Sequence, residues 1–126
     1  FLGVSYTDPN TSQPTFNQYY PGSISASDIK AVVAAHPHTL YEVQSDEAVA
    51  QTSLGMTGDL VQTASGSTIT GNSGLQFDGS TASVGGELFK IVDFVNRPGS
   101  TVGDTYTDLV VMLSPAENAF LTDPIT

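Results

Sequence analysis

Two segments near the end of the chain carry its strongest hydrophobic pattern. Residues 87–95 (ELFKIVDFV) and 105–114 (TYTDLVVMLS) are short runs rich in β-branched and aromatic residues. Such runs, bounded by turn-forming residues, are typical of β-strands. The sequence RPGSTVGD between them interrupts the apolar pattern, as turns do. The two segments are therefore predicted to pair as a long hairpin.

Weaker patterns predict further short elements. Residues 1–6 alternate between apolar and small side chains, which predicts a short strand. Residues 48–62 mix glycine with apolar residues and predict an irregular segment with a short turn of helix. Residues 66–86 are poor in charge, and they predict one or two short strands joined by tight turns at GNSG and DGS.

The segment Ser27 to Gln44 has two interpretations. Ser27 could cap a helix and the following alanines favour one, so a short helix over Asp28 to Ala35 is possible in principle. Pro37 ends any such helix, and the following LYEVQ has a strand-like pattern. We favour a β-hairpin that turns at HPHT, with the helix as the alternative.

Taken together, these elements predict an all-β protein. Strands recur every 8 to 12 residues without βαβ alternation, which indicates a small β-sandwich or barrel with at most one short helix. We predict three parts: an extended arm rich in proline and aromatic residues (1–22), a β domain (23–114) and a C-terminal tail (115–126).

The stretch Tyr6 to Gly22 (YTDPNTSQPTFNQYYPG) combines aromatic rings with three prolines. Proline lacks an amide donor, so this stretch is predicted to be an extended loop, with at most a short strand around Phe16 to Tyr20 that is not central in a sheet. The rings either fill the domain's own core or contact another subunit, since interfaces are enriched in such side chains. The interface candidates are Tyr6, Phe16, Tyr19 and Tyr20.

Charge and composition exclude several classes of partner. The formal net charge is −10, from 13 acidic residues against Lys30, Lys90 and Arg97. Nucleic acids and anionic membrane surfaces need clustered cations, so neither is an expected partner. No apolar run reaches the length of about 20 residues that a membrane-spanning helix needs. The sequence has no signal-peptide pattern. It opens at Phe1 without a Met, so we expect it to be processed or incomplete.

Candidate chemical groups are sparse. There is no cysteine, which excludes disulfides and thiolate metal sites. His36 and His38 flank Pro37, but a zinc site needs about three protein ligands, so exposed imidazoles in a turn are the better interpretation. Asp78-Gly79-Ser80 resembles a fragment of a calcium loop without its full set of oxygen ligands, and an ordinary turn explains it better.

Catalytic motifs are also missing. Asp104 and Asp108 could share one face of a strand, but such a pair is more often a solvated surface than an acid–base site. The sequence has no GxSxG, no phosphate-binding loop and no dinucleotide fingerprint. Asn10-Thr11-Ser12 matches a glycosylation sequon, a match that arises readily by chance. We therefore predict no catalytic residue, cofactor or metal, and no enzymatic activity.

Four stretches together resemble a known family. They are FLGVSYTDPNTSQPTFNQYYPGS, LYEVQSDEAVAQTSLGMTGDLV, TGNSGLQFDGSTAS and IVDFVNRPGSTVGDTYTDLVVML. In this order they are similar to small virion proteins of tailed bacteriophages, regarded as head decoration (cement) or auxiliary capsid proteins. The resemblance spans residues 1 to 114, and its most specific pieces are YTDP with the following aromatic run and VGDTYTDLVV. The chain departs from it at VVAAHPHT, where an acidic turn would be expected.

The resemblance implies a structural role without catalysis. The implied partner is the major capsid protein, the implied location is the capsid exterior, and the chain would act there as a homo-oligomer that stabilises the lattice. The residues alone leave two alternatives open. One is a self-assembling extracellular filament or surface-layer subunit, and the other is a carbohydrate-binding module whose tyrosines stack on sugars.

Overall fold

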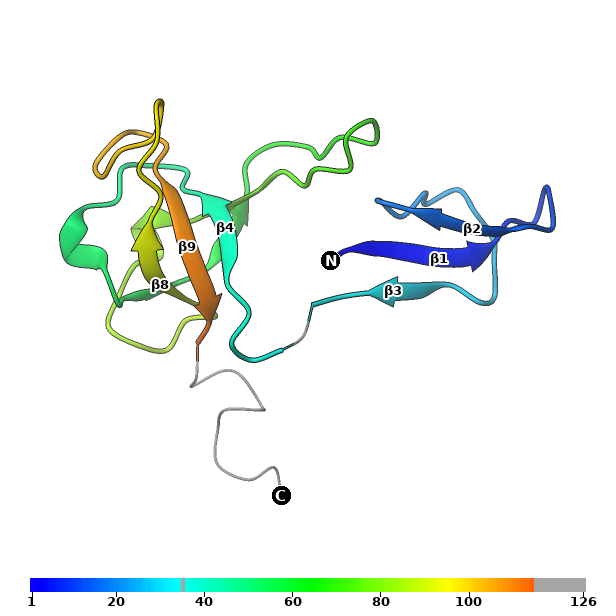
Figure 1. The fold of residues 1–126 in the computed structure, drawn as a ribbon, viewed down its shortest axis with the longest axis horizontal. Helices are drawn as coiled ribbons and strands as arrows, with labels where there is room; N and C mark the ends of the chain where they lie inside the picture. The colour runs from blue at the N-terminus through cyan, green and yellow to red at the C-terminus, as the bar shows by residue number, and fades with distance from the viewer. Residues whose placement is uncertain (35, 115–126) are drawn as a thin grey trace, which may run out of the picture. The chain divides into compact units, whose positions relative to one another are not determined.

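The computed structural model describes residues 1–34 and 36–114, which form short strands and two 3-10 turns (Figure 1). No α-helix occurs in these described residues. The predicted all-β class is confirmed. The strands are β1 (Gly3–Thr7), β2 (Pro14–Asn17), β3 (Lys30–Val32), β4 (Tyr41–Gln44), β5 (Thr57–Gly58), β6 (Leu60–Gln62), β7 (Leu75–Phe77), β8 (Phe89–Phe94) and β9 (Asp108–Leu113), and the 3-10 turns are η1 (Gln51–Ser53) and η2 (Gly79–Thr81).

The chain divides into two compact units. Unit 1 comprises residues 1–35 and 66–73, and unit 2 comprises residues 36–65 and 74–126. Unit 1 contains a three-stranded sheet in the order β2-β1-β3, and unit 2 contains a four-stranded sheet, β4-β9-β8-β5, and the pair β6-β7. This division differs from the predicted boundary at residue 22, because β3 pairs with β1. The predicted tail, 115–126, lies outside the described residues.

The predicted hairpin of β8 and β9 is confirmed, and a bulge in β8 shapes the core of unit 2. Ile91 pairs with Val111 and Phe94 pairs with Leu109, with a shift in register between them at Val92. Residues three apart in a regular strand point to opposite faces. The extra residue at Val92 reverses this alternation, so Ile91 and Phe94 are both buried on the same side.

Both sheets of unit 2 contribute to one core. Its buried members are Val49, Phe77, Ile91, Phe94, Leu109 and Val111. The Phe77 ring, which is fully buried, lies so close to the backbone of Gly58 that a Cβ placed there would be 2.3 Å from Cζ of the ring. A glycine at position 58 is therefore required for β7 to pack against β5.

The prediction of a hairpin turning at HPHT is wrong, and so is the helical alternative. The turn itself exists, since the amide of Thr39 donates to the carbonyl of His36 at 3.0 Å. However, β3 pairs with β1 and β4 pairs with β9, so the strands on either side of the turn belong to different sheets. The reason lies in β4, whose apolar side chains Tyr41 and Val43 pack against the core of unit 2.

We predict that Gly58→Ala destabilises unit 2, because its methyl group overlaps the Phe77 ring and both are enclosed by the core. The expected loss in free energy of unfolding is about 1–3 kcal/mol, typical of overpacking, measured by urea denaturation followed by circular dichroism. Gly22→Ala is the matched control, because nothing lies within 4 Å of its added Cβ. Equal stability of the two variants would contradict the described contact.

Candidate functional site

The aromatic stretch of the sequence forms a β-hairpin in unit 1. The turn between β1 and β2 is closed by two backbone bonds, from the amide of Asp8 to the carbonyl of Gln13 (2.9 Å) and from the amide of Ser12 to the carbonyl of Asp8 (2.7 Å). The Asp8 side chain also accepts a bond from the amide of Asn10 at 2.8 Å. Pro14 begins β2, which is an edge strand, as expected for a strand that contains proline.

One face of this three-stranded sheet is the core of unit 1. Val4 and Tyr6 alternate on β1 and both are buried. The side-chain amide of Asn17 donates to the Tyr6 hydroxyl at 2.7 Å. Burial, and then the nearby Asp8 carboxylate, raises the pKa of Tyr6. Tyr6 is therefore a core residue of its own unit. Its ring is buried and is not exposed for the contact with another subunit that the sequence suggested.

The opposite face carries exposed apolar side chains around Gly3. Phe16 lies opposite Ser5, and its ring leans diagonally over Gly3, where an added Cβ would be 2.2 Å from Cζ. Val32 lies directly opposite Gly3 on β3, so it projects from the same face. The outer sides of these residues remain open to solvent, since Phe16 is 57% and Val32 is 42% exposed.

The structure does not bring the four predicted interface residues into one patch. Tyr19 is partly buried, and its hydroxyl is near enough to Tyr6 to influence its pKa, which places it toward the core face and away from Phe16. Tyr20 follows β2 and is 52% exposed. Sequence reasoning missed Val32. Its signal was the apolar run KAVV, which we assigned to the first strand of a hairpin turning at HPHT.

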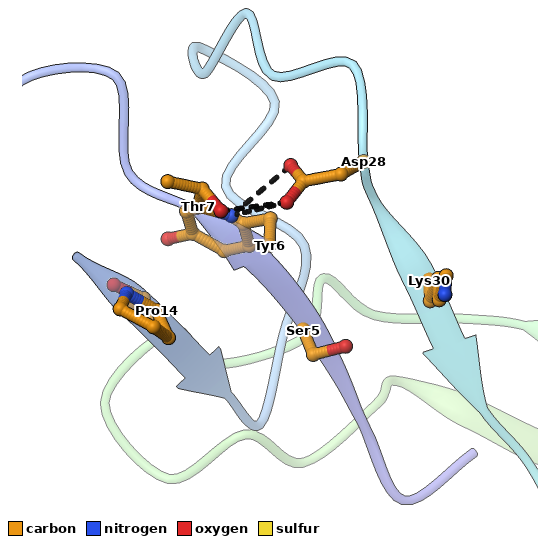
Figure 2. Close-up of a pocket in the computed structure, with 7 residues that line it drawn as sticks. Ser5, Tyr6, Thr7, Pro14, Asp28 and Lys30 are labelled. Atoms are coloured by element: carbon orange, nitrogen blue, oxygen red, sulfur yellow. Dashed lines mark hydrogen bonds between the residues drawn. The ribbon is translucent and has the colours of Figure 1, made fainter. Parts of the chain in front are cut away.

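A shallow pocket of about 200 Å³ opens beside β1 (Figure 2). Its main polar feature is Asp28, whose carboxylate accepts bonds from the Thr7 amide (3.1 Å to each oxygen) and from the Thr7 hydroxyl (2.7 Å). These bonds tie the segment before β3 to the end of β1. The residues lining the pocket are Ser5, Tyr6, Thr7, Pro14, Thr15, Asp28 and Lys30.

The remaining candidate groups have structural roles. His36 and His38 are exposed in the predicted turn, where the His38 amide donates to Nδ1 of His36 at 3.2 Å. Asp78 caps η2 by accepting a bond from the Ser80 amide at 3.0 Å, so a turn is present at the predicted position. Ligand oxygens of Asp78, Asp46 and Glu47 lie within 4.8 Å of one another.

This acidic cluster is the set of described residues that could hold a cation. Two of its three carboxylates already have partners from the backbone. The Asp46 side chain accepts a bond from the amide of Gly79 at 3.1 Å, and Asp78 accepts its capping bond. The hydrogen bonds of Asp46 and Asp78 therefore hold the turn after β7 in place.

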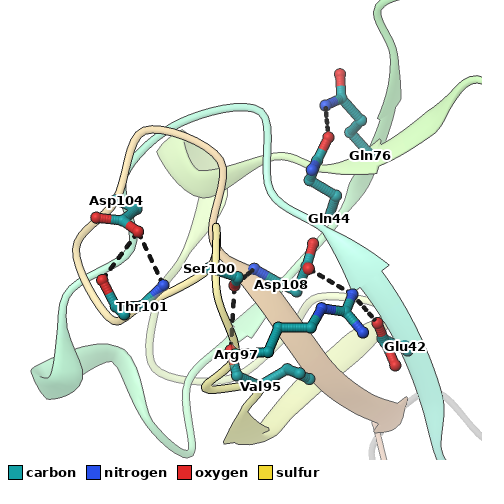
Figure 3. A network of polar contacts seen from close by, with 9 residues as sticks. All are labelled: Glu42, Gln44, Gln76, Val95, Arg97, Ser100, Thr101, Asp104 and Asp108. Atoms are coloured by element: carbon teal, nitrogen blue, oxygen red, sulfur yellow. Dashed lines mark hydrogen bonds and ion pairs between the residues drawn. The ribbon is translucent and has the colours of Figure 1, made fainter.

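Asp104 and Asp108 do not act as a pair (Figure 3). Asp104 accepts bonds from the amide and hydroxyl of Thr101, both at 2.8 Å, within the loop before β9. Asp108 forms an ion pair with Arg97 at 2.6 Å, and the same guanidinium group contacts Glu42 at 2.5 Å. Hydrogen bonds to these two carboxylates raise the pKa of Arg97. The network joins β4, β9 and the loop after β8.

Charge is distributed very unevenly between the two units. Unit 1 contains two acids, Asp8 and Asp28, against Lys30, which gives a formal net charge of −1. The other eleven acids of the chain belong to unit 2, against Lys90 and Arg97, which gives −9. Unit 1 is therefore nearly neutral and exposes apolar rings, whereas unit 2 carries almost all of the acidity.

The Asp28–Thr7 contact predicts a dependence on pH. The bonds from Thr7 lower the pKa of Asp28, so the ionised form stabilises the folded state. This stabilisation is present above the pKa of the unfolded chain and is lost as the pH falls through the lowered folded value. We expect the NMR shift of the Thr7 amide to titrate at that lowered value. In Asp28→Asn this titration should be absent, and its persistence there would contradict the assignment.

No protein-family model, curated protein sequence or solved structure matches this chain. Among residues 1–34 and 36–114, no helix is long and apolar enough to cross a membrane. Evidence for function therefore comes from the arrangement of the residues described above, and its most distinctive feature is the exposed apolar face of unit 1.

Proposed function

We propose that this protein is a non-enzymatic structural component of a bacteriophage head, which binds the outer surface of the capsid and stabilises its lattice. The major capsid protein is its partner, and the chain acts as a homo-oligomer on the capsid exterior. Unit 1 provides the docking surface, with Phe16 and Tyr20 as its anchors. Unit 2 is the stable, acidic part that remains in solvent.

The observation that carries this proposal is the incomplete burial of unit 1. Val4 and Tyr6 are the buried hydrophobic side chains among its described residues. Units of about 40 residues usually need disulfides, metals or association to be stable, and this chain has no cysteine. Exposed rings on such a unit are well explained if a partner completes its core.

The charge distribution supports the same assignment of roles. Charged residues are depleted at the centres of protein interfaces, where aromatic residues are enriched. The nearly neutral unit 1 fits that composition, whereas the charge of −9 on unit 2 favours solubility and repulsion between copies. A small protein present in many copies on one surface needs both properties.

The carbohydrate-binding alternative has less support. It requires aromatic rings that line an open groove, because sugars stack on ring faces. The pocket beside β1 is lined by one aromatic residue, Tyr6, whose ring is buried, and otherwise by Ser5, Thr7, Asp28 and neighbouring residues. Phe16, Tyr19 and Tyr20 do not line it. The filament alternative predicts self-assembly of the purified chain without any other protein, which sedimentation would reveal.

We predict that the double variant Phe16→Ala, Tyr20→Ala remains folded but binds capsids at least about tenfold more weakly. Burying one large ring contributes roughly 1.5–3 kcal/mol, and a factor of ten corresponds to about 1.4 kcal/mol. The measurement is co-sedimentation with capsids from which this protein has been removed.

Tyr106→Ala is the matched control, since Tyr106 is 54% exposed on unit 2 and lies outside the proposed surface. Its binding should equal that of the unmodified chain. If the double variant binds normally, unit 1 does not dock through these rings. If it unfolds on its own, the rings belong to the core of the isolated protein.

A further inference from the structure

The sheet of unit 1 has one protected edge and one open edge. Its strand order is β2-β1-β3, so β2 and β3 form the two edges (Figure 1). β2 begins at Pro14, which has no amide hydrogen, and just after its other end Gln18 packs against the 66–73 loop, since a Cβ added at Gly71 would be 2.7 Å from the Gln18 Cβ. β3 contains no proline and is exposed along its whole length. Such an edge is a template for another strand.

The backbone hydrogen bonds show which groups of β3 point outward. The Val32 carbonyl faces β1, because it accepts a bond from the Leu2 amide at 2.7 Å. Backbone groups of successive residues in a strand point to opposite sides, so the amide and carbonyl of Ala31 point away from β1. Continued by one residue beyond each end of β3, the same alternation turns those of Ile29 and Val33 outward. No backbone group of the described chain outside the sheet bonds to these residues.

Hydrogen bonding and charge together indicate what can occupy this edge. A row of outward amides and carbonyls is matched by an extended backbone, which adds to the sheet as a further strand. Unit 2, with a net charge of −9, repels other copies of the chain, whereas unit 1 carries only −1. Two copies can therefore approach each other most easily through unit 1, where the open edge lies.

Asp28 and Lys30 make the edge complementary to itself. They lie two residues apart, on either side of Ile29, and both line the pocket beside β1 (Figure 2). When two identical strands pair antiparallel about Ile29, Lys30 of each copy lies opposite Asp28 of the other, and such opposite-charge pairs are favourable. Pairing about Ala31 would place Lys30 opposite Val32 instead. Charge therefore selects the register centred on Ile29.

We infer that two copies of this chain pair through their β3 edges, antiparallel and centred on Ile29, which joins their three-stranded sheets into one. The Ile29 residues exchange two backbone hydrogen bonds. The Asp28 carboxylate, although bonded to Thr7, has about four acceptor sites and keeps capacity for the lysine of the second copy. Because β2 is protected, each copy offers one open edge of this sheet, so the contact is a closed two-fold.

The inference deepens the proposed function, on which it rests for the homo-oligomer whose surface it names. It also differs from the filament alternative. A filament needs two complementary surfaces on each copy, whereas a self-complementary edge is used up when two copies meet. Assembly through β3 is therefore expected to stop at the dimer.

Cross-linking tests the register, because the chain has no cysteine of its own. Ile29→Cys places two thiols opposite each other in a hydrogen-bonded pair, where the Cα atoms are about 5.5 Å apart, within the range of a disulfide. Ala31→Cys is the matched control, since its thiols would be separated by about four residues, or about 13 Å, along the strands. Under mild oxidation we expect Ile29→Cys to form a covalent dimer and Ala31→Cys to remain a monomer of about 13.1 kDa.

Reversible association is measured by sedimentation of the purified chain over a series of concentrations. Ala31→Pro removes an outward amide but no bond to β1, so it should abolish the dimer while circular dichroism stays unchanged. Lys30→Glu places like charges opposite each other and should weaken the dimer at least about tenfold. Lys90→Glu, with the same net charge but on β8 of unit 2, should dimerise like the unmodified chain.

Each contrary result overturns the inference. A chain that stays monomeric up to about 1 mM does not pair through β3. A dimer that cross-links through Ala31→Cys but not Ile29→Cys has another register, and assembly beyond two copies contradicts a closed contact. If Ala31→Pro loses its β structure, the cross-links and the two glutamate variants still decide. None of these measurements uses capsids, so a dimer that fails to bind capsids refutes the proposed function and leaves the β3 contact established.

Discussion

A phenylalanine ring resting on a glycine backbone is the contact on which both units are built. At Gly58 the absence of a side chain lets Phe77 of β7 reach β5, which joins the two sheets of unit 2 around one core. At Gly3 the same absence lets Phe16 of the edge strand β2 lie against the central strand β1. Because only the first ring is covered, unit 2 is complete by itself and unit 1 has an open apolar face.

This difference also explains how charge is used in the chain. Unit 2 has enough apolar burial to tolerate a net charge of −9, with Arg97 joining Glu42 and Asp108 where acids come close together. Unit 1 buries few apolar side chains, so it could offset little repulsion between like charges, and it carries only three charged side chains. Its Asp28 is bonded to Thr7, so even this carboxylate acts within the unit. A nearly neutral unit joined to an acidic one suits a protein that binds through the first unit and is kept in solution by the charge of the second.

The all-β class and the β8–β9 hairpin could be predicted because those strands have strong apolar patterns of their own. The pairing of Lys30–Val32 could not, since its partner strand lies more than twenty residues earlier and a short exposed strand carries little pattern. The bulge at Val92 was also not predictable, because the pattern of Ile91 to Phe94 is that of one uninterrupted strand. The aromatic stretch was recognised from composition, but composition could not assign Tyr6 to one face of the sheet and Phe16 to the other.

Hydrogen–deuterium exchange on the free protein and on decorated capsids tests the central claim most directly. Small units with few buried side chains open often, so amides in β1, β2 and β3 should exchange quickly in the free chain, while those in β8 and β9 should be protected. On capsids, we predict strong new protection in β1 to β3 and little change in β8 and β9. New protection confined to unit 2, with β1 to β3 unchanged, would contradict it.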